Sequence, residues 1–365
     1  MPAALRCPAC GQTYAAGPNE PWRCRCGSPL ELETLPTPGE RPTSFDRDRG
    51  LWAFEQLLPV DCEVTLGEGW TPLIEAQDWD ATFKLEYVFP SGSFKDRGAT
   101  TTLSRAAALS VDRVVEDSSG NAGAAIALYA ARAGIPADIY VPSDVKPAKR
   151  EAIAGTGANV IEIEGVRADV SAAARTAVEN GAGWYASHAW NPTFFEGTAT
   201  AAYEIAVQRD FNAPDAMVVP LGHGTLYLGL YRGFKRLADA DWIDTVPRLL
   251  GVQATGVAPF VDRSDEGVTA GNHNELADGI QIAKPARKRM IEGAVAETDG
   301  EVIAIDADAT RAAWRALHEA GFHVEPTSAV AVAGLEAYRA QGLTSSNVVV
   351  PLTGSGLKTD PAKIA

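Results

Sequence analysis

From about Thr82 onward, short apolar runs alternate with alanine-rich stretches of helical length. Such runs, bounded by turn residues, are typical of buried strands, and strands that alternate with helices form parallel sheets covered by helices. The predicted strands are Phe83–Val88, Arg113–Glu116, Ala137–Val141, Val160–Ile163, Ala216–Val219, Leu249–Val252 and Val348–Pro351. The predicted helices are Phe94–Ala108, Ala122–Ala133, Pro147–Ala154, Ala172–Glu179, Thr198–Gln208, Leu226–Leu237, Thr310–Ala320 and Ser328–Ala340. The pattern predicts an α/β fold with a parallel sheet covered by helices.

Length and charge exclude several classes of protein. The 365 residues are enough for two core domains and an appendage. With 47 acidic against 32 basic residues, the chain would repel a phosphate backbone, so nucleic acid is not an expected partner. The sequence contains no apolar run long enough to cross a membrane and no signal-peptide pattern at its N-terminus, which predicts no membrane association and a cytoplasmic location.

Four of the five cysteines crowd the N-terminus in a CxxC and a CxC turn. Four thiolates can surround a metal tetrahedrally, and zinc is the metal that such ligands most often hold in a structural site. The alternatives are buried free thiols or a knuckle that no longer binds metal. The pattern favours a zinc-ribbon-like module whose ligands are Cys7, Cys10, Cys24 and Cys26, whereas the separate Cys62 is expected in the core.

The segment Pro90–Gly98 reads PSGSFKDRG, with Lys95 at the start of a predicted helix. Lysine is the side chain that forms a Schiff base with the aldehyde of pyridoxal phosphate, and a rigid turn at a helix start would hold it in place. The preceding Ser-Gly-Ser allows the backbone to approach a ligand closely. Alone, the segment is also compatible with an ordinary surface lysine.

Three further loops follow apolar strands, where open α/β sheets bind ligands. Asp117–Gly123 opens an alanine-rich helix and could hold a carboxylate at the helix N-terminus, although it could equally be a simple helix cap. Val219–Leu226 contains Gly222 and Gly224, which suit a phosphate but fit neither a Walker loop nor a dinucleotide fingerprint. Val348–Lys358 ends in a hydroxyl-rich glycine turn that could meet a ring nitrogen, or be an ordinary turn.

These segments, in this order, resemble the β-family of pyridoxal-phosphate enzymes, which is fold type II and includes tryptophan synthase β-chain, cysteine synthase, threonine dehydratase and threonine synthase. The resemblance covers the chain from about Gly67 to Lys358. Within the family, GSFKDRG, SSGNAGAAIALYAARAG, NPTFFEG and LTGSGLK look most like threonine synthase, which often carries an N-terminal cysteine module. The resemblance implies a lyase of amino-acid biosynthesis, with a homodimer as the expected assembly and an amino acid as its small-molecule substrate.

The resemblance also assigns roles to individual residues. Lys95 would be the catalytic lysine that carries the cofactor, and Asn121 would bond the phenolic oxygen of the cofactor. Thr353 would face the pyridine nitrogen. The cofactor phosphate would lie against Gly222, His223, Gly224, Thr225 and Leu226, and the substrate α-carboxylate against Ser118, Ser119, Gly120, Asn121 and Ala122.

The fold, the domains and the reaction are expected to follow the same family, which implies an α/β fold of two domains, each with an open, twisted, mainly parallel sheet and helices on both faces. Residues 1–30 would form the zinc-ribbon-like module and residues 31–50, with three prolines, a linker. Residues 51–92 and 196–365 would form the large pyridoxal-phosphate domain, and residues 93–195 the small one. The implied reaction converts O-phosphohomoserine and water into threonine and phosphate by γ-elimination and β-addition. Lys95 would move protons at Cα and Cβ.

Two departures from the family pattern bear on the substrate. Phe89–Gly92 replaces the common Asn-Pro-Thr-Gly entry, and Phe194 and Phe195 stand where a basic residue is often found. Because a phosphorylated substrate needs cations, these aromatic residues favour a serine or threonine dehydratase, or a β-replacing enzyme similar to cysteine synthase. Glu196-Gly197 and LTGSGLK favour threonine synthase, and other cations are available at Arg97, Lys146, Lys149, Arg150 and Arg167. A non-catalytic protein that binds through its zinc module is a more remote alternative.

Overall fold

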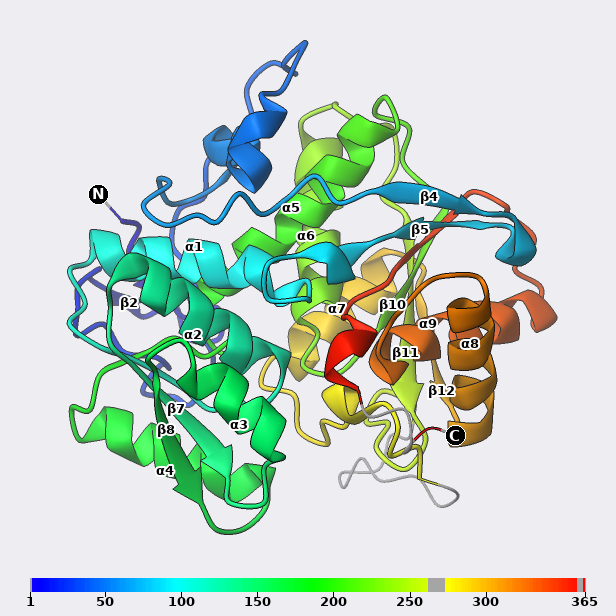
Figure 1. The fold of residues 1–365 in the computed structure, drawn as a ribbon. Coiled ribbons are helices and arrows are strands. Elements are labelled where there is room, and N and C mark those ends of the chain that lie inside the picture. Colours follow the sequence, from blue (N-terminus) through cyan, green and yellow to red (C-terminus); the bar gives the residue numbers. More distant parts are fainter. Residues whose placement is uncertain (1, 262–272, 360–363, 365) are drawn as a thin grey trace. The chain divides into compact units, whose positions relative to one another are not determined.

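A computed structural model describes residues 2–261, 273–359 and 364, and it divides the chain into two compact units (Figure 1). The first unit comprises Met1–Gly69 and Lys95–Thr200, and the second comprises Trp70–Phe94 and Ala201–Ala365. No helix within the described residues is long and apolar enough to cross a bilayer. The domain boundaries and the linker expected from the sequence stay predictions.

The first unit is built on a four-stranded parallel sheet with strand order β8-β7-β6-β9. Its strands are β6 (Val114–Glu116), β7 (Ala137–Pro142), β8 (Asn159–Ile163) and β9 (Trp184–Tyr185), and its helices are α1 (Lys95–Ala108), α2 (Asn121–Ala133), α3 (Pro147–Ala154) and α4 (Arg167–Glu179). Alanine has the highest helix propensity, which suits the alanine-rich α2. That helix ends at Gly134 in the left-handed region, with φ of 68°, as helix C-termini often do.

A fifth helix, α5 (Pro192–Gln208), begins in the first unit and ends in the second. Within the first unit its early turns pack very closely on α1. A Cβ on Gly98 would lie 2.2 Å from Cδ1 of Phe194, and a Cβ on Gly197 would lie 2.0 Å from the carbonyl oxygen of Arg97. Glycine at these two positions therefore lets the two helices approach.

The cysteine turns belong to a three-stranded antiparallel sheet with strand order β2-β1-β3, made of β1 (Leu5–Arg6), β2 (Thr13–Tyr14) and β3 (Glu31–Leu32). Side chains between its cysteine turns fix it to the rest of the first unit. Glu20 accepts a bond of 2.6 Å from Arg105 of α1, and both side chains are almost fully buried. The Trp22 ring meets Tyr185 and Trp190 edge to face, at centroid distances of 5.4 and 4.8 Å.

The second unit is built on a six-stranded sheet with strand order β12-β11-β10-β13-β5-β4. Only β4 runs antiparallel to its neighbour. The strands are β4 (Leu73–Ala76), β5 (Ala81–Lys84), β10 (Ala216–Pro220), β11 (Arg248–Ala254), β12 (Glu301–Ile305) and β13 (Val348–Pro351), and the helices are α6 (Thr225–Asp239), α7 (Lys288–Glu297), α8 (Ala307–Glu319) and α9 (Pro326–Ala340).

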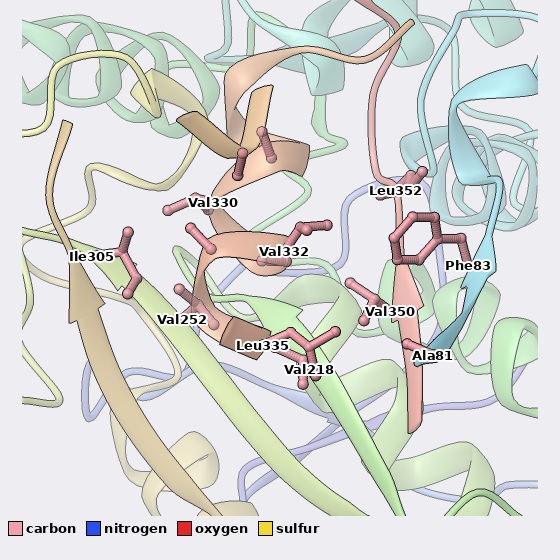
Figure 2. Close-up of a cluster of buried hydrophobic side chains, with 14 of the residues drawn as sticks. Ala81, Phe83, Val218, Val252, Ile305, Val330, Val332, Leu335, Val350 and Leu352 are labelled. Atoms are coloured by element: carbon pink, nitrogen blue, oxygen red, sulfur yellow. The ribbon is translucent and has the colours of Figure 1, made fainter. Parts of the chain in front are cut away.

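The core of the second unit lies between this sheet and α9, as Figure 2 shows. Val218, Val252 and Val350 contribute from three neighbouring strands, and Val332 and Leu335 contribute from the helix. All five are at most 1% exposed. Burying an aliphatic side chain of this size stabilises the fold by about 1.5–3 kcal/mol, so this face of α9 anchors the sheet that carries the loops described below.

The structure corrects the expected strand Phe83–Val88, because the strand ends at Lys84 and a short 3-10 turn occupies residues 86–88. Lys84 is fully buried, and its ammonium donates to Glu204, Gln208 and the carbonyl of Thr71 at 2.7–2.8 Å. A buried cation is tolerated when all its donors are satisfied in this way. The expected helix from Thr198 begins six residues earlier, at Pro192, and the expectations lacked the strands of the cysteine module, β4, β9, β12 and α7.

We predict that Gly197→Ala lowers the free energy of unfolding by about 1–3 kcal/mol, because the added methyl would overlap the backbone carbonyl of Arg97. Gly293→Ala is the matched control, since Gly293 lies inside α7 with open space around its Cα. That change should leave stability equal or raise it by up to about 1 kcal/mol. Urea unfolding of both variants measures the difference, and equal midpoints would contradict the packing argument.

Candidate active site

Three parallel strands of the second unit, β5, β13 and β10, are neighbours and therefore end at the same edge of the sheet. The segment that precedes Lys95 follows β5, the hydroxyl turn with Thr353 follows β13, and the glycine loop with Gly222 follows β10. The carboxyl edge of a parallel sheet is where α/β proteins bind ligands. Within the second unit, the structure thus brings three of the sequence-predicted segments together.

The loop after β10 is shaped to receive an anion. Gly224 has φ of 75° and precedes α6, whose first turn presents backbone N–H groups that no helix carbonyl accepts. A Cβ on Gly222 would lie 2.9 Å from Cα of Ile280, and a Cβ on Gly224 would lie 2.5 Å from Cδ1 of Ile291. Glycine at these two positions therefore lets Ile280 and Ile291 pack closely against the loop.

The turn after β13 holds a pair of buried hydroxyl groups. The Oγ1 atom of Thr353 lies 3.1 Å from Oγ of Ser328, the residue at the third position of α9. Ser328 also accepts a bond of 2.9 Å from the backbone N–H of Gly354. These contacts fix the Thr353 hydroxyl in position. The sequence analysis did not single out Ser328, although a serine in the first turn of a helix is a common polar anchor.

Backbone pairing joins the segment before Lys95 to this same turn. Ser93 pairs with Gly354 in an antiparallel bridge, and the backbone N–H of Phe94 donates to the carbonyl of Thr353 at 3.0 Å. Lys95 is the next residue along the chain and the first of α1. The segment that immediately precedes Lys95 in the chain therefore lies directly beside Thr353.

In the first unit, β6 and β9 run parallel, and the Ser118–Ala122 segment follows β6. A Cβ on Gly123 would lie 1.7 Å from the carbonyl oxygen of Ser118, so only glycine allows this loop to fold back on α2. The Ser118 hydroxyl accepts a bond of 3.2 Å from the N–H of Gly120. The resulting turn presents the N-terminus of α2, which begins at Asn121.

The Lys95 ammonium lies over the ring of Phe194, 5.8 Å from its centroid. The His188 ring lies on the same phenylalanine, with centroids 6.1 Å apart. Both Phe194 and Phe195 are fully buried. The aromatic residue that replaces the expected basic one is thus a packing element between α1, α5 and His188.

Next to it, Glu116 and His188 form a pair that the sequence analysis missed. His188 Nδ1 lies 2.9 Å from Oε1 of Glu116, and the His188 backbone N–H donates to Oε2 at 3.1 Å. Burial raises the pKa of Glu116 to about 8. Burial also holds the pKa of His188 well below its usual value, and the charge of Lys95 lowers it further. An acidic residue at the end of the apolar strand VVE was the available signal.

The structure separates the basic residues considered for a substrate phosphate. Arg97 is fully buried and donates to Thr200 at 2.9 Å. Arg150 is exposed and forms an ion pair of 3.1 Å with Glu162. Lys146 precedes α3, Lys149 lies on α3 and Arg167 begins α4, all at least partly exposed.

The four N-terminal cysteine sulfurs lie within 4.8 Å of one another. The Sγ atoms of Cys7 and Cys26 are 3.6 Å apart, and those of Cys10 and Cys24 are 3.5 Å apart. A tetrahedral zinc site with ordinary Zn–S bonds has sulfurs separated by about 3.8 Å, which these distances fit closely. The Tyr14 hydroxyl, 3.2 Å from Cys24, and the backbone of Cys26 are the main causes that lower the pKa of the Cys24 thiol to about 6, which favours a metal-binding thiolate.

Comparison with known proteins gives a consistent result. Residues 64–354 match the family described as "Pyridoxal-phosphate dependent enzyme". Threonine synthase from Methanocaldococcus jannaschii is 30% identical over 98% of this chain and 94% of its own length, and threonine synthase from Methanosarcina acetivorans is 32% identical over 86% and 81%. The structure of a fungal L-serine ammonia-lyase from Rhizomucor miehei has the same fold, with a TM-score of 0.69, 23% identity and coverage of 80% and 96%.

The raised pKa of Glu116 predicts a specific pH dependence of stability. A carboxyl whose pKa is higher in the folded chain stabilises the fold at low pH, and this contribution is lost as pH rises from its ordinary value, 4.5, to about 8. We therefore expect Glu116→Gln to gain stability relative to the wild type across that range, by up to roughly 1 kcal/mol per pH unit. Urea unfolding at several pH values measures this difference.

Asp138→Asn is the matched control, because Asp138 lies on the neighbouring strand β7 and pairs with Arg113 at 2.7 Å. It should keep the slope of the wild type. A Glu116→Gln stability curve parallel to that of the wild type would show that the buried carboxyl does not titrate as expected.

Proposed function

The chain belongs to the threonine synthase group of the pyridoxal-phosphate-dependent enzymes, and from this we propose that it converts O-phosphohomoserine and water into threonine and phosphate. One observation carries the proposal. Lys95 begins α1 directly after a segment whose backbone is paired to the Thr353 turn, on the sheet edge that also carries the glycine loop. A lysine, a hydroxyl and an anion loop are the groups that the cofactor requires.

The residues present fit pyridoxal phosphate. We propose that the loop from Gly222 to Leu226, including His223 and Thr225, holds the cofactor phosphate, because it forms the N-terminus of α6, where the N–H groups of the first helical turn favour an anion. Thr353, held by Ser328, would give the ring nitrogen a neutral partner. Lys95 would bind the aldehyde, and Asn121 would bond the phenolic oxygen. The second unit would then be the cofactor-binding domain.

The bound cofactor supplies an electron sink for carbanions formed at the substrate. The chain's own residues then bind, orient and transfer protons. The loop Ser118–Ala122 would hold the substrate carboxylate, since the N-terminus of α2 favours an anion. The Lys95 amine would remove and return protons at Cα and Cβ. A neutral hydroxyl at Thr353 leaves the ring less electron-withdrawing than a carboxylate partner would, which suits elimination and replacement.

A second candidate function is the deamination of serine or threonine. Its support is the burial of Phe194 and Phe195, which leaves no cation at the position where one is often found in threonine synthases. Under the first proposal, the substrate phosphate would need one of the exposed cations Lys146, Lys149 and Arg167 of the first unit. Of the two, the threonine synthase reaction agrees with the relatives that match most of the chain.

We further propose that Cys7, Cys10, Cys24 and Cys26 hold a structural zinc ion, on the strength of their sulfur distances. A cytoplasmic homodimer is the assembly and location we expect for this amino-acid biosynthetic enzyme.

Lys95→Ala should abolish the visible absorbance of the bound cofactor and lower phosphate release from O-phosphohomoserine by about 10³-fold or more, because it removes both the covalent link and the base. Lys235→Ala, an exposed lysine on α6, is the control and should behave like the wild type. Released phosphate, threonine and 2-oxo acids are measured with O-phosphohomoserine, serine and threonine as separate substrates.

Phosphate release with an equal amount of threonine would support the synthase. If serine or threonine instead gives 2-oxo acids and O-phosphohomoserine does not react, the protein is a deaminase and the threonine synthase proposal is wrong. Wild-type activity in Lys95→Ala would overturn both.

Cys24→Ser should lower the zinc content from about one ion per chain to a small fraction, since one thiolate of a four-ligand site is lost. Cys62→Ser is the control, because Cys62 lies outside the cluster. Elemental analysis of purified protein gives the stoichiometry. A wild-type protein without metal, after purification in the presence of zinc, would contradict the assignment.

A further inference from the structure

The Glu116–His188 pair is placed beside the catalytic lysine but has no part in the function proposed above. Glu116 ends β6, directly before the loop assigned to the substrate carboxylate, and His188 follows β9, the neighbouring strand. Glu116 is fully buried, and the side chain of His188 is 12% exposed. The Lys95 ammonium and the His188 ring both lie against Phe194, 5.8 and 6.1 Å from its ring centroid, and the charge of Lys95 lowers the pKa of both Glu116 and His188.

A simple structural role explains this pair poorly. A carboxyl and an imidazole that only packed the core would be more stable as apolar side chains, because burial of either charged form is costly. The pair instead meets through a ring nitrogen and a carboxyl oxygen at 2.9 Å, where one proton can be held by either atom. Because a neutral imidazole also keeps the hydrogen on its other ring nitrogen, the pair with this shared proton is neutral overall, and without it the pair carries one negative charge.

We propose that Glu116 and His188 are positioning residues for Lys95, which together hold one proton and release it when the Lys95 nitrogen becomes charged. This inference rests on the proposed role of Lys95. When Lys95 is an uncharged amine, the proton stays between Glu116 and His188. When Lys95 gains a proton, the pair loses one, so the buried group of three keeps the same net charge. One N–H bond forms at Lys95 while one O–H or N–H bond of the pair breaks.

Other polar groups face the pair and bear on its charge. Asp117, next to Glu116, accepts hydrogen bonds from Tyr185 at 2.8 Å and from Ser171, and it favours a charged His188. Arg167 of α4 opposes a charge on His188, as Lys95 does. Burial raises the pKa of Asp117, and the neighbouring Glu116 raises it further. The two cations and the burial outweigh Asp117 and keep the imidazole neutral, so Glu116 is the member that can take the negative charge.

The test measures the reactivity of the Lys95 amine in the full-length chain after the cofactor has been removed. Acetic anhydride reacts with the uncharged amine only, and mass spectrometry of the Lys95 peptide gives the rate from about pH 6 to about pH 10. Glu116→Gln removes the anion that stabilises the charged amine. We therefore expect acylation near neutral pH to be about tenfold faster, the change that corresponds to a shift of one pKa unit.

His188→Asn should act in the opposite direction. An asparagine amide can donate a hydrogen bond to Oε1 of Glu116, but unlike an imidazole it cannot become protonated. The donated hydrogen bond favours the carboxylate form of Glu116, and the carboxylate in turn favours the charged Lys95 amine. Acylation should be several-fold slower than in the wild type, by roughly the same one-unit argument. The double variant should resemble Glu116→Gln, because no carboxyl remains to titrate. Asp138→Asn should leave the rate unchanged.

Three results would overturn the proposal: Glu116→Gln within about twofold of the wild type, shifts of the same sign in both single variants, or an equal change in Asp138→Asn. If a variant does not fold, the proposal can still be tested on the wild-type protein by NMR. The chain has five histidines, and acylation of Lys95 should move the ring NMR signals of one of them. Histidine signals that do not respond would also overturn it.

These readouts are independent of turnover. If the two variants shift acylation in opposite directions but the protein releases no phosphate from O-phosphohomoserine, the role proposed for the pair stands and the proposed reaction is wrong. If the protein makes threonine but the acylation rate of Lys95 is the same in Glu116→Gln as in the wild type, the proposed reaction stands and the role proposed for the pair is wrong.

Discussion

Two backbone pairings, Ser93 with Gly354 and Phe94 with Thr353, join the turn before Lys95 to the turn after β13. They are possible because β5 and β13 are parallel neighbours, so both turns leave the sheet at the same edge. The turn that precedes Lys95 then depends on the core that anchors the sheet, in which α9 packs against three central strands. Main-chain hydrogen bonds, and not side chains alone, therefore hold this turn against its neighbour.

The sequence predicted elements best where burial and composition agreed. The helix Pro147–Ala154 and the strand Val348–Pro351 have the predicted bounds. The predicted strand from Phe83 extends too far because apolar residues continue past Lys84, whereas the strand ends at Lys84 and a 3-10 turn follows. Helix α5 was begun too late, although Asn191, whose side chain accepts from the N–H of Thr193, and Pro192 are ordinary start signals. Partly exposed β12 lacked a continuous apolar run.

At the candidate site, local sequence located the loops but not the contacts between distant segments. The glycines around Lys95 and in the anion loop can be recognised from spacing, because a bare backbone is a local property. The approach of His188 to Glu116 joins residues 72 positions apart, and that of Ser328 to Thr353 joins residues 25 apart. The sequence identifies Phe194 only as a departure from the family's basic residue, and the fold adds that its ring packs against Gly98 in the helix contact.

The contact between Glu20 and Arg105 limits how easily the N-terminal segment could be lost during evolution. Arg105 lies inside α1, the helix that begins with Lys95, and its charge is neutralised by a carboxylate from the loop between the two cysteine turns. A shortened chain without that loop would leave a guanidinium buried beside the helix and would expose the face that Trp22 covers. Losing the module would therefore require compensating changes at Arg105 and around Trp190, so the appendage and the helix of the lysine are constrained to evolve together.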